Sequence, residues 1–243
     1  MNNPPQHPRK TSLDLRHRLV DGLKQGFVAE TGLIAHGRGE AYDYLLGERT
    51  CVHAERAEKA ASALLLSSEK PVFSVNGNVA ALCPKDVIRL SKAVKALLEV
   101  NLFYRTPLRE RLIARVLEDS GAELVYGLRK RHRIPGLGSQ RANVDDALWD
   151  SDTVLVMLED GDRTGALKAM GKKVIAVDLN PLSRTARTAD ITIVDNVVRA
   201  VPNMIVHARS MKDMSRGRLA SIAARFDNRK NLKIMEGLFR KSL

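Results

Sequence analysis

The sequence predicts an α/β protein with a Rossmann-like, largely parallel sheet and helices on both faces. Two observations lead to this fold class. Helix-like and strand-like segments alternate along most of the chain, and the strand-like segments are continuous apolar runs. Strands that are buried on both faces by crossover helices have this composition. We expect one such domain over residues 1–243, with helical segments at both ends packed on it.

The helices are predicted from their first and last residues. Thr11 or Ser12 begins the first helix and Gly26 follows it, whereas Pro84 stands in the first turn of a later one. Helices are expected at 11–25, 52–68, 84–96, 107–120 and 163–170, and from about 197 onward. The stretch GLIAHGRGEAYDY, 32–44, is not expected to be regular, because glycines on both sides of an arginine disfavour helix and strand.

The strands are predicted from short apolar runs that end in polar residues. The first, PVFSV at 71–75, runs into the turn Asn76-Gly77-Asn78. The others are expected at LLEVNLFYR (97–105), ELVYGL (123–128), DTVLVM (152–157), KKVIAV (172–177) and ITIV (191–194).

Polar residues follow most of these strands. Right-handed crossovers place the carboxyl ends of parallel strands at one edge of the sheet, where ligands bind. We therefore expect one site, formed by Asn76, Asn78, Asn101, Tyr104, Arg105, residues 159–163, residues 178–184, Asp195 and Asn196. Asparagine amides, Tyr104 and Arg105 are suited to an anionic substrate, although an ordinary turn explains the asparagines equally well.

The formal net charge of +12 predicts anionic partners, either nucleic acid or small molecules that carry phosphates. The basic residues are densest at 127–141, in GLRKRHRIPGLGSQR. No apolar run approaches the ~20 residues that span a bilayer, and the polar N-terminus lacks a signal-peptide core. These features predict a cytoplasmic protein with no membrane partner.

Two acidic motifs each allow two interpretations. Asp178, after a strand, either accepts a hydrogen bond from a ribose hydroxyl or holds the Asn180-Pro181 turn. Glu159, Asp160 and Asp162 bind Mg²⁺ beside phosphates or begin a helix, and the two interpretations are compatible. Neither a GxGxxG motif nor a P-loop occurs in the chain, so neither supports nucleotide binding.

His36, Arg38 and Glu40 lie in the glycine-rich stretch. Glycine lets the backbone approach a ligand closely, and the planar guanidinium of Arg38 matches a phosphate or carboxylate. We interpret this segment as a phosphate or substrate site with catalytic residues, although a lone histidine such as His36 is often only a loop residue.

Six segments together resemble the archaeal phosphopantothenate synthetase (4-phosphopantoate–β-alanine ligase) family. They are GLIAHGRGEAYDYLLGERT, PVFSVNGNVAAL, EVNLFYRT, LEDGDRT, VDLNPLSRTAR and ADITIVDNVVRA. The resemblance spans roughly residues 7–230, and the basic loop at 127–150 is its divergent part.

The resemblance implies a step of coenzyme A biosynthesis. ATP and Mg²⁺ would be used to join 4-phosphopantoate to β-alanine, with AMP and pyrophosphate released through an acyl-adenylate, in a homodimeric enzyme. The implied ATP contacts are Arg16, Arg38, Asp178, Leu179, Asn180, Arg184, Thr185, Asn196 and Val197.

Two rival functions remain at this stage. A nucleic-acid-binding protein explains the net charge, but aromatic residues are not interleaved with the basic ones for base stacking. An ADP-forming kinase acting on a small acid would use similar substrates and release a different nucleotide.

Overall fold

The computed structural model describes residues 9–138 and 140–242 and contains a five-stranded parallel sheet. The strand order is β2-β1-β5-β6-β7, and each neighbouring pair is parallel. The strands are β1 (Pro71–Val75), β2 (Leu97–Val100), β5 (Thr153–Met157), β6 (Lys173–Val177) and β7 (Ile191–Ile193). The predicted fold class is confirmed.

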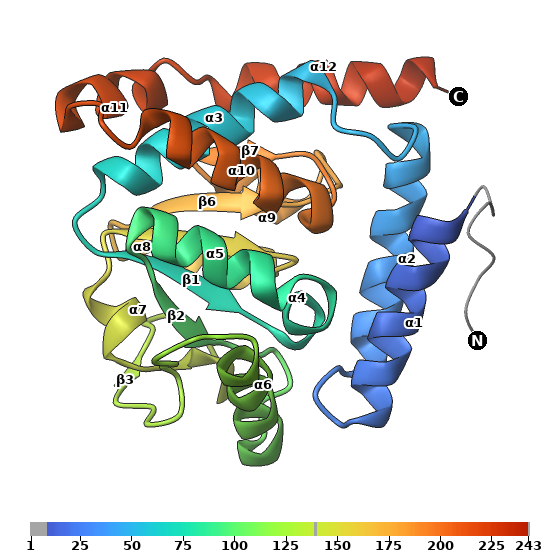
Figure 1. Ribbon diagram of the computed structural model, residues 1–243, viewed down its shortest axis with the longest axis vertical. Coiled ribbons are helices and arrows are strands. Elements are labelled where there is room, and N and C mark those ends of the chain that lie inside the picture. The colour runs from blue at the N-terminus through green and yellow to red at the C-terminus, as the bar shows by residue number, and fades with distance from the viewer. Residues whose placement is uncertain (1–8, 139, 243) are drawn as a thin grey trace.

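Helices pack on both faces of this sheet because alternate strand residues point to opposite sides. Phe73, Leu155 and Ile175 belong to the core under α3 (Val52–Ser67), α5 (Pro84–Val94) and α10 (Val197–Met211), which lie in front of the strands in Figure 1. Val154 and Val174 belong to a second core with α7 (Asp146–Asp150) and α8 (Gly161–Ala169).

The remaining helices cover the margins. α6 (Pro107–Asp119) lies beside β2 and α5, whereas α9 (Arg184–Thr188) lies beside β6 and β7. α11 (Arg216–Ala224) packs on α3, and α12 (Asn228–Lys241) contacts α3, α9 and β7. No helix in the described ranges is both long and apolar enough to cross a membrane.

The predicted strand at 123–128 is wrong. Only Tyr126 forms a bridge, parallel to Glu99 of β2, and the chain then turns away at Gly127, whose φ is +103°. The chain continues through a small hairpin, β3 (His132–Arg133) with β4 (Asn143–Val144), and the 3₁₀ turn Gln140–Ala142. The expected turn after β1 is instead the start of a short helix, α4 (Gly77–Leu82).

The glycine-rich stretch is also a correction, because it lies within the helix α2 (Glu30–Leu45). A Cβ on Gly32 would lie 2.4 Å from Oδ1 of Asn78, so glycine permits close packing there. Tertiary packing thus outweighs a helix-propensity cost of about 1 kcal/mol per glycine. Together with α1 (Lys10–Lys24), α2 stands across the edge toward which the strand arrows point in Figure 1.

Candidate functional site

The strand order reverses between β1 and β5, and the backbone there is strained. The chain proceeds from β1 outward to β2 and then returns to place β5 on the other side of β1. Leu158, directly after β5, has a φ of +54°, a conformation that is costly for a branched side chain. The side chain of Asn76 donates to the carbonyls of Met157 (2.9 Å) and Leu158 (3.2 Å). Ligands of open α/β sheets bind at such a reversal.

Hydrogen bonds hold helix α2 across this edge. Asn78 of α4 donates to the carbonyl of Gly32 at 2.8 Å, and Asn196, after β7, donates to Asp43 of α2 at 2.8 Å. A Cβ on Gly39 would lie 3.5 Å from Leu179, the second residue after β6. The helix therefore spans the ends of several strands, and it carries His36, Arg38 and Glu40.

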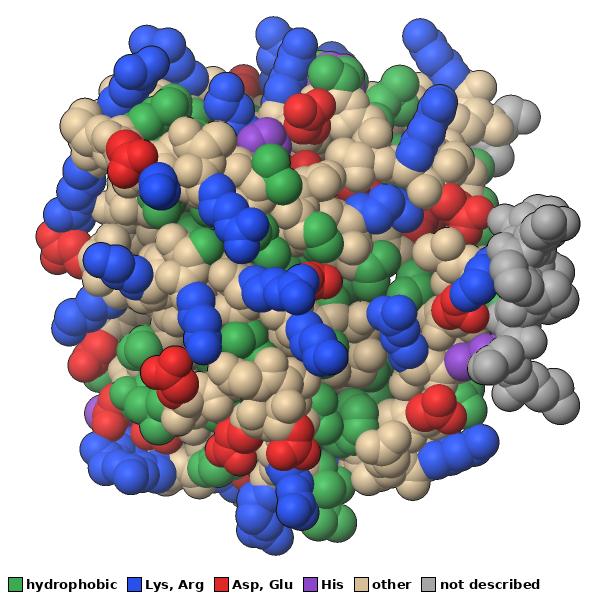
Figure 2. Space-filling model, viewed as in Figure 1, with side chains coloured by type: hydrophobic (Ala, Val, Ile, Leu, Met, Phe, Trp, Pro, Cys, Tyr) green, Lys and Arg blue, Asp and Glu red, His purple; other side chains and the backbone are tan. Residues whose placement is uncertain are grey.

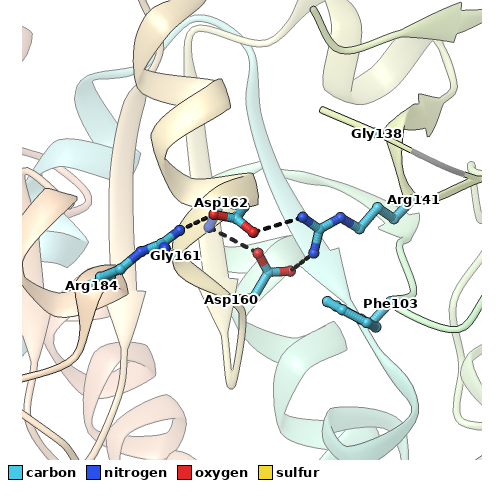
Figure 3. Close-up of a pocket in the computed structure, with 7 residues that line it drawn as sticks. All are labelled: Phe103, Gly138, Arg141, Asp160, Gly161, Asp162 and Arg184. Atoms are coloured by element: carbon cyan, nitrogen blue, oxygen red, sulfur yellow. Dashed lines mark hydrogen bonds and ion pairs between the residues drawn. The ribbon is translucent and has the colours of Figure 1, made fainter. Parts of the chain in front are cut away.

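A pocket of about 540 Å³ opens at the same edge (Figure 3). Its lining residues come from the ends of β2 and β5, the basic loop and the start of α9, and they are Phe103, Gly138, Arg141, Asp160, Gly161, Asp162 and Arg184. Asp162 forms ion pairs with both Arg184 and Arg141, the latter at 2.8 Å. The pocket has the volume of a small-molecule site and two arginines in its wall.

Glu40 forms an ion pair with Arg16, and His36 lies near enough to both for their charges to act on its pKa. Glu40 accepts two hydrogen bonds from Nε of Arg16 at 3.0 Å and one from Nη2 at 2.7 Å. Burial raises the pKa of Glu40, but the hydrogen bonds and charge of Arg16 outweigh burial and leave it lowered. Burial lowers the pKa of His36, so its imidazole is neutral at pH 7. Its buried Nε2 has no hydrogen-bond partner among the described residues.

Arg38 is exposed beside this cluster. Its charge lowers the pKa of Asp178, although burial of that carboxyl raises the pKa more strongly. A Cβ placed on the neighbouring Gly37 would have no atom within 4 Å. Gly37 therefore has no packing reason to be glycine, and the space beside it is open.

Asp178 holds the turn that follows β6. One carboxylate oxygen accepts from the backbone N–H of Asn180 at 2.9 Å, and the other accepts from the Ser183 hydroxyl. The turn interpretation of Asp178 is thus confirmed, and its ATP contact stays a prediction.

We expect Asp178→Ala to lower the free energy of unfolding without ATP by about 0.5–2 kcal/mol, the usual cost of losing such a cap. Asp178→Asn should cost less, because the Ser183 hydroxyl can donate to or accept from the amide. Urea unfolding of both variants measures this. An alanine variant of unchanged stability, with a raised KM for ATP, would show that the carboxylate acts on the nucleotide instead.

The three acids after β5 are engaged by other groups of the protein, and the Mg²⁺ site assigned to them stays a prediction. Asp160 begins α8, accepting from the backbone N–H groups of Asp162 (2.9 Å) and Arg163 (3.0 Å). Burial raises the pKa of Glu159 to about 7, and its carboxylate lies 3.4 Å from Nε of Arg163. Across the described residues, no three His, Cys, Asp or Glu side chains are grouped to hold a metal ion. These carboxylates are directed at arginines and helix N–H groups.

Most of the predicted substrate residues are bound internally. Asn76 and Asn78 join strands and helices as described above, and Asn101 accepts from Arg163 at 3.3 Å. Arg105 is buried, forms an ion pair with Glu110 and donates to main-chain carbonyls. These residues shape the edge of the sheet. Tyr104 is exposed, and its ring packs edge-on against Phe103.

Of the residues predicted to contact ATP after β6 and β7, Arg184 lines the pocket and others make contacts within the fold. Arg184 lines the pocket, whereas the Thr185 hydroxyl donates to the carbonyl of Glu159 at 2.8 Å. Asn196 begins α10, and Val197 is the buried first residue of that helix. All of these residues follow β6 or β7.

A buried polar network that the sequence did not predict ties α2 to α10. Arg199 of α10 forms ion pairs with Asp43 of α2 and with Asp195, the latter at 2.5 Å. Thr50 donates to the other oxygen of Asp195 at 2.6 Å. The Asp43–Arg199 contact spans 156 positions, so no local pattern could reveal it. Phe103 and Arg141 were missed as site residues too; the density of basic residues in the loop at 127–141 was the only signal for Arg141.

Glu58 of α3 lies at the margin of this network. It is fully buried, Asn203 donates to Oε1 at 3.4 Å, and Oε2 has no partner among the described residues. Burial raises the pKa of Glu58 to about 8, and the negative charge of Asp195 contributes. The folded protein therefore holds the Glu58 proton more tightly than the unfolded chain does, and the stabilisation this gives is lost as the pH rises through 8.

We expect Glu58→Gln to be more stable than the parent protein at pH 9 by more than about 1 kcal/mol, and nearly equal at pH 5. Urea unfolding at both pH values measures the difference, with the exposed Glu55→Gln on the same helix as a control. An advantage of Glu58→Gln that does not change with pH would contradict the assigned titration.

Known proteins are similar to this chain over most of its length. A family model described as phosphopantothenate/pantothenate synthetase matches residues 53–241. A 4-phosphopantoate--beta-alanine ligase of Thermococcus kodakarensis is 56% identical over 234 residues, covering 96% of this chain and 90% of the relative. Proteins of the same name from Methanosarcina mazei and Methanospirillum hungatei are 47% and 51% identical, covering 94% and 83% of this chain and 90% and 82% of the relatives. The chain therefore belongs to the phosphopantothenate/pantothenate synthetase family.

Proposed function

We propose that this protein joins 4-phosphopantoate to β-alanine, consuming ATP and releasing AMP and pyrophosphate. The observation that carries the proposal is the near full-length similarity to 4-phosphopantoate--beta-alanine ligases, at 47–56% identity. The arginine-lined pocket at the reversal point of the sheet supports it, because both anionic substrates need positive charge.

The nucleotide is assigned to the β6–β7 half of the edge. The turn at 178–183, the start of α9 and the start of α10 follow β6 and β7, and the charge of Arg38 on α2 acts on Asp178 in that turn. Arg16 of α1, which the resemblance also implies as an ATP contact, is hydrogen-bonded to Glu40. ATP would lie along this half, with its triphosphate toward Arg38 and Arg184. We expect Mg²⁺ to accompany the triphosphate, since Mg²⁺ is commonly bound through substrate phosphates and few carboxylates.

The first step of the reaction brings two anions together, the carboxylate of the acid and the triphosphate of ATP. A carboxylate oxygen of the acid attacks the α-phosphorus of ATP, the bond to pyrophosphate breaks, and an acyl-adenylate forms. The β-alanine nitrogen then attacks the acyl carbon, loses a proton and displaces AMP. Guanidinium groups that face the phosphates offset the charge repulsion in the first step.

His36 is suited to accept the proton in the second step. Its imidazole is neutral at pH 7, and its Nε2 is buried with no partner among the described residues. Glu40 is less suited, since its carboxylate is held by Arg16 and its pKa is lowered. This assignment places the base on the same helix as Arg38.

The nucleic-acid alternative has less support. On the face seen in Figure 2, Lys and Arg side chains are spread among acidic ones and form no continuous stripe. Several basic residues of the loop at 127–141 also pair with acids, including Lys130 with Glu110 and Arg131 with Asp146. We propose small-molecule substrates only, with no nucleic-acid partner, and a homodimer as the working assembly.

The test is an incubation of the protein with ATP, Mg²⁺, β-alanine and 4-phosphopantoate, with products identified by mass. 4′-Phosphopantothenate and AMP should form together, and omission of either acid or amine should prevent amide formation. ADP as the main nucleotide product would contradict the proposal and favour a kinase.

A further inference from the structure

A buried arginine holds both ends of the segment 127–143, which contains the basic loop at 127–141. Arg105 donates to the carbonyl of Gly127 at 2.6 Å and to the carbonyl of Asn143, and it forms an ion pair with Glu110. The Asp145 carboxylate also accepts from the N–H groups of Gly127 (3.2 Å) and Arg129 (3.3 Å). The loop therefore has a fixed base beside the carboxyl end of β2.

A second buried arginine holds the far part of this loop at the pocket. Arg163, with no exposed surface, donates to the carbonyl of Arg141 and to Oδ1 of Asn101. It thereby joins the loop to the strand ends. Of the basic residues in the loop, Arg141 is the one that lines the pocket, whereas Lys130 and Arg131 pair with acids elsewhere.

The Arg141 guanidinium faces groups that a ligand can replace. It lies 2.8 Å from Asp162 and 3.4 Å from Asp160, and its central carbon is 4.7 Å from the centre of the Phe103 ring (Figure 3). Arg184 contacts the other oxygen of Asp162 from the opposite side. The exposed Asp162 carboxylate thus occupies the place beside the Arg141 guanidinium where an anionic ligand would bind.

We propose that Arg141 binds the 4-phosphate of the acid substrate, and that the Asp162 carboxylate pairs with the Arg141 guanidinium when no substrate is bound. The inference rests on the proposed function. Arg141 and Phe103 lie toward β2, on the opposite side of the pocket from the β6–β7 half assigned to ATP. The half-exposed Phe103 ring offers an apolar surface to the two methyl groups of pantoate, and the planar guanidinium matches a phosphate. Arg141 is thus a specificity residue for the phosphorylated acid.

The kinetic test compares Arg141→Ala with Arg131→Ala, a control in the same loop. In Arg141→Ala, kcat/KM for 4-phosphopantoate should fall by about ten- to 150-fold, the size of a lost charge-assisted hydrogen bond. The KM for ATP and any rate with unphosphorylated pantoate should be unchanged, and Arg141→Lys should recover only part of the loss. The assignment would be overturned if Arg141→Ala lowered the rates with 4-phosphopantoate and with unphosphorylated pantoate equally, or if it raised only the KM for ATP.

A binding test separates this inference from the ligase proposal. Calorimetric titration of 4-phosphopantoate without ATP or Mg²⁺ should give weaker binding to Arg141→Ala and tighter binding to Asp162→Asn, which removes the competing carboxylate. The opposite signs cannot arise from destabilisation, and melting curves of each variant check folding. Unchanged affinity in Arg141→Ala would overturn the inference even if the parent protein is an active ligase. Weaker binding would uphold it even if no amide product forms.

Discussion

Arg199→Met is expected to lower the free energy of unfolding by about 3–5 kcal/mol, the cost of removing one partner from a buried ion pair. Asp43 and Asp195 are 4% and 1% exposed, and both direct carboxylate oxygens at Arg199. Methionine fills much of the volume but leaves two buried carboxylates without their cation. For a chain of this size the melting temperature should fall by roughly 10 °C.

The matched control is Arg209→Met, an exposed position in the last turn of the same helix. It should cost no more than about 1 kcal/mol. Adding Asp43→Asn and Asp195→Asn to Arg199→Met should restore part of the stability, because the unpaired charges are then removed. A single Arg199→Met variant as stable as the control would contradict the role assigned to this network.

Arg38→Ala is expected to reduce kcat/KM for ATP by about ten- to a few hundredfold, since a charge-assisted hydrogen bond is worth about 1.5–3 kcal/mol. The exposed side chain contributes little to packing, so the melting temperature without ATP should change little. Lysine should not restore the rate, because a point charge does not replace the planar guanidinium. Steady-state kinetics of Arg38→Ala, Arg38→Lys and the control Arg209→Ala measure this.

Near-normal kinetics in Arg38→Ala would show that the open space beside Gly37 serves something other than ATP. A proportionate loss of stability and rate would instead make Arg38 a structural residue. These two outcomes are separable because unfolding is measured without nucleotide.

The parallel sheet was predictable because buried strands are continuous apolar runs, and PVFSV and TVLVM contain no regular polar alternation. The position of the site followed from topology, since polar residues after parallel strands meet at one edge. Helix α2 was not predictable from local propensity. Gly32 is explained by its contact with Asn78, which lies 46 positions away in sequence.

The roles of individual residues were harder to predict than their location. Arg105 and Asp178 both follow strands, as ligand-binding residues do. Arg105, however, donates to the carbonyl of Gly127 in the basic loop, and Asp178 accepts from the N–H of Asn180 in a turn. A polar side chain after a strand is equally suited to either role until its partners are known. Arg141 was hidden among the neighbouring basic residues, because only its tertiary contacts with Asp162, Phe103 and Arg163 distinguish it.

The central claim is that the carboxyl edge of the sheet beneath α2 activates the acid as an adenylate. Exchange of labelled pyrophosphate into ATP, measured without β-alanine, tests it most directly. Label should enter ATP only when 4-phosphopantoate is present, and Arg38→Ala should slow the exchange by about ten- to a few hundredfold. Amide formation by the parent protein with no exchange under these conditions, or exchange that does not depend on the acid, would contradict the account.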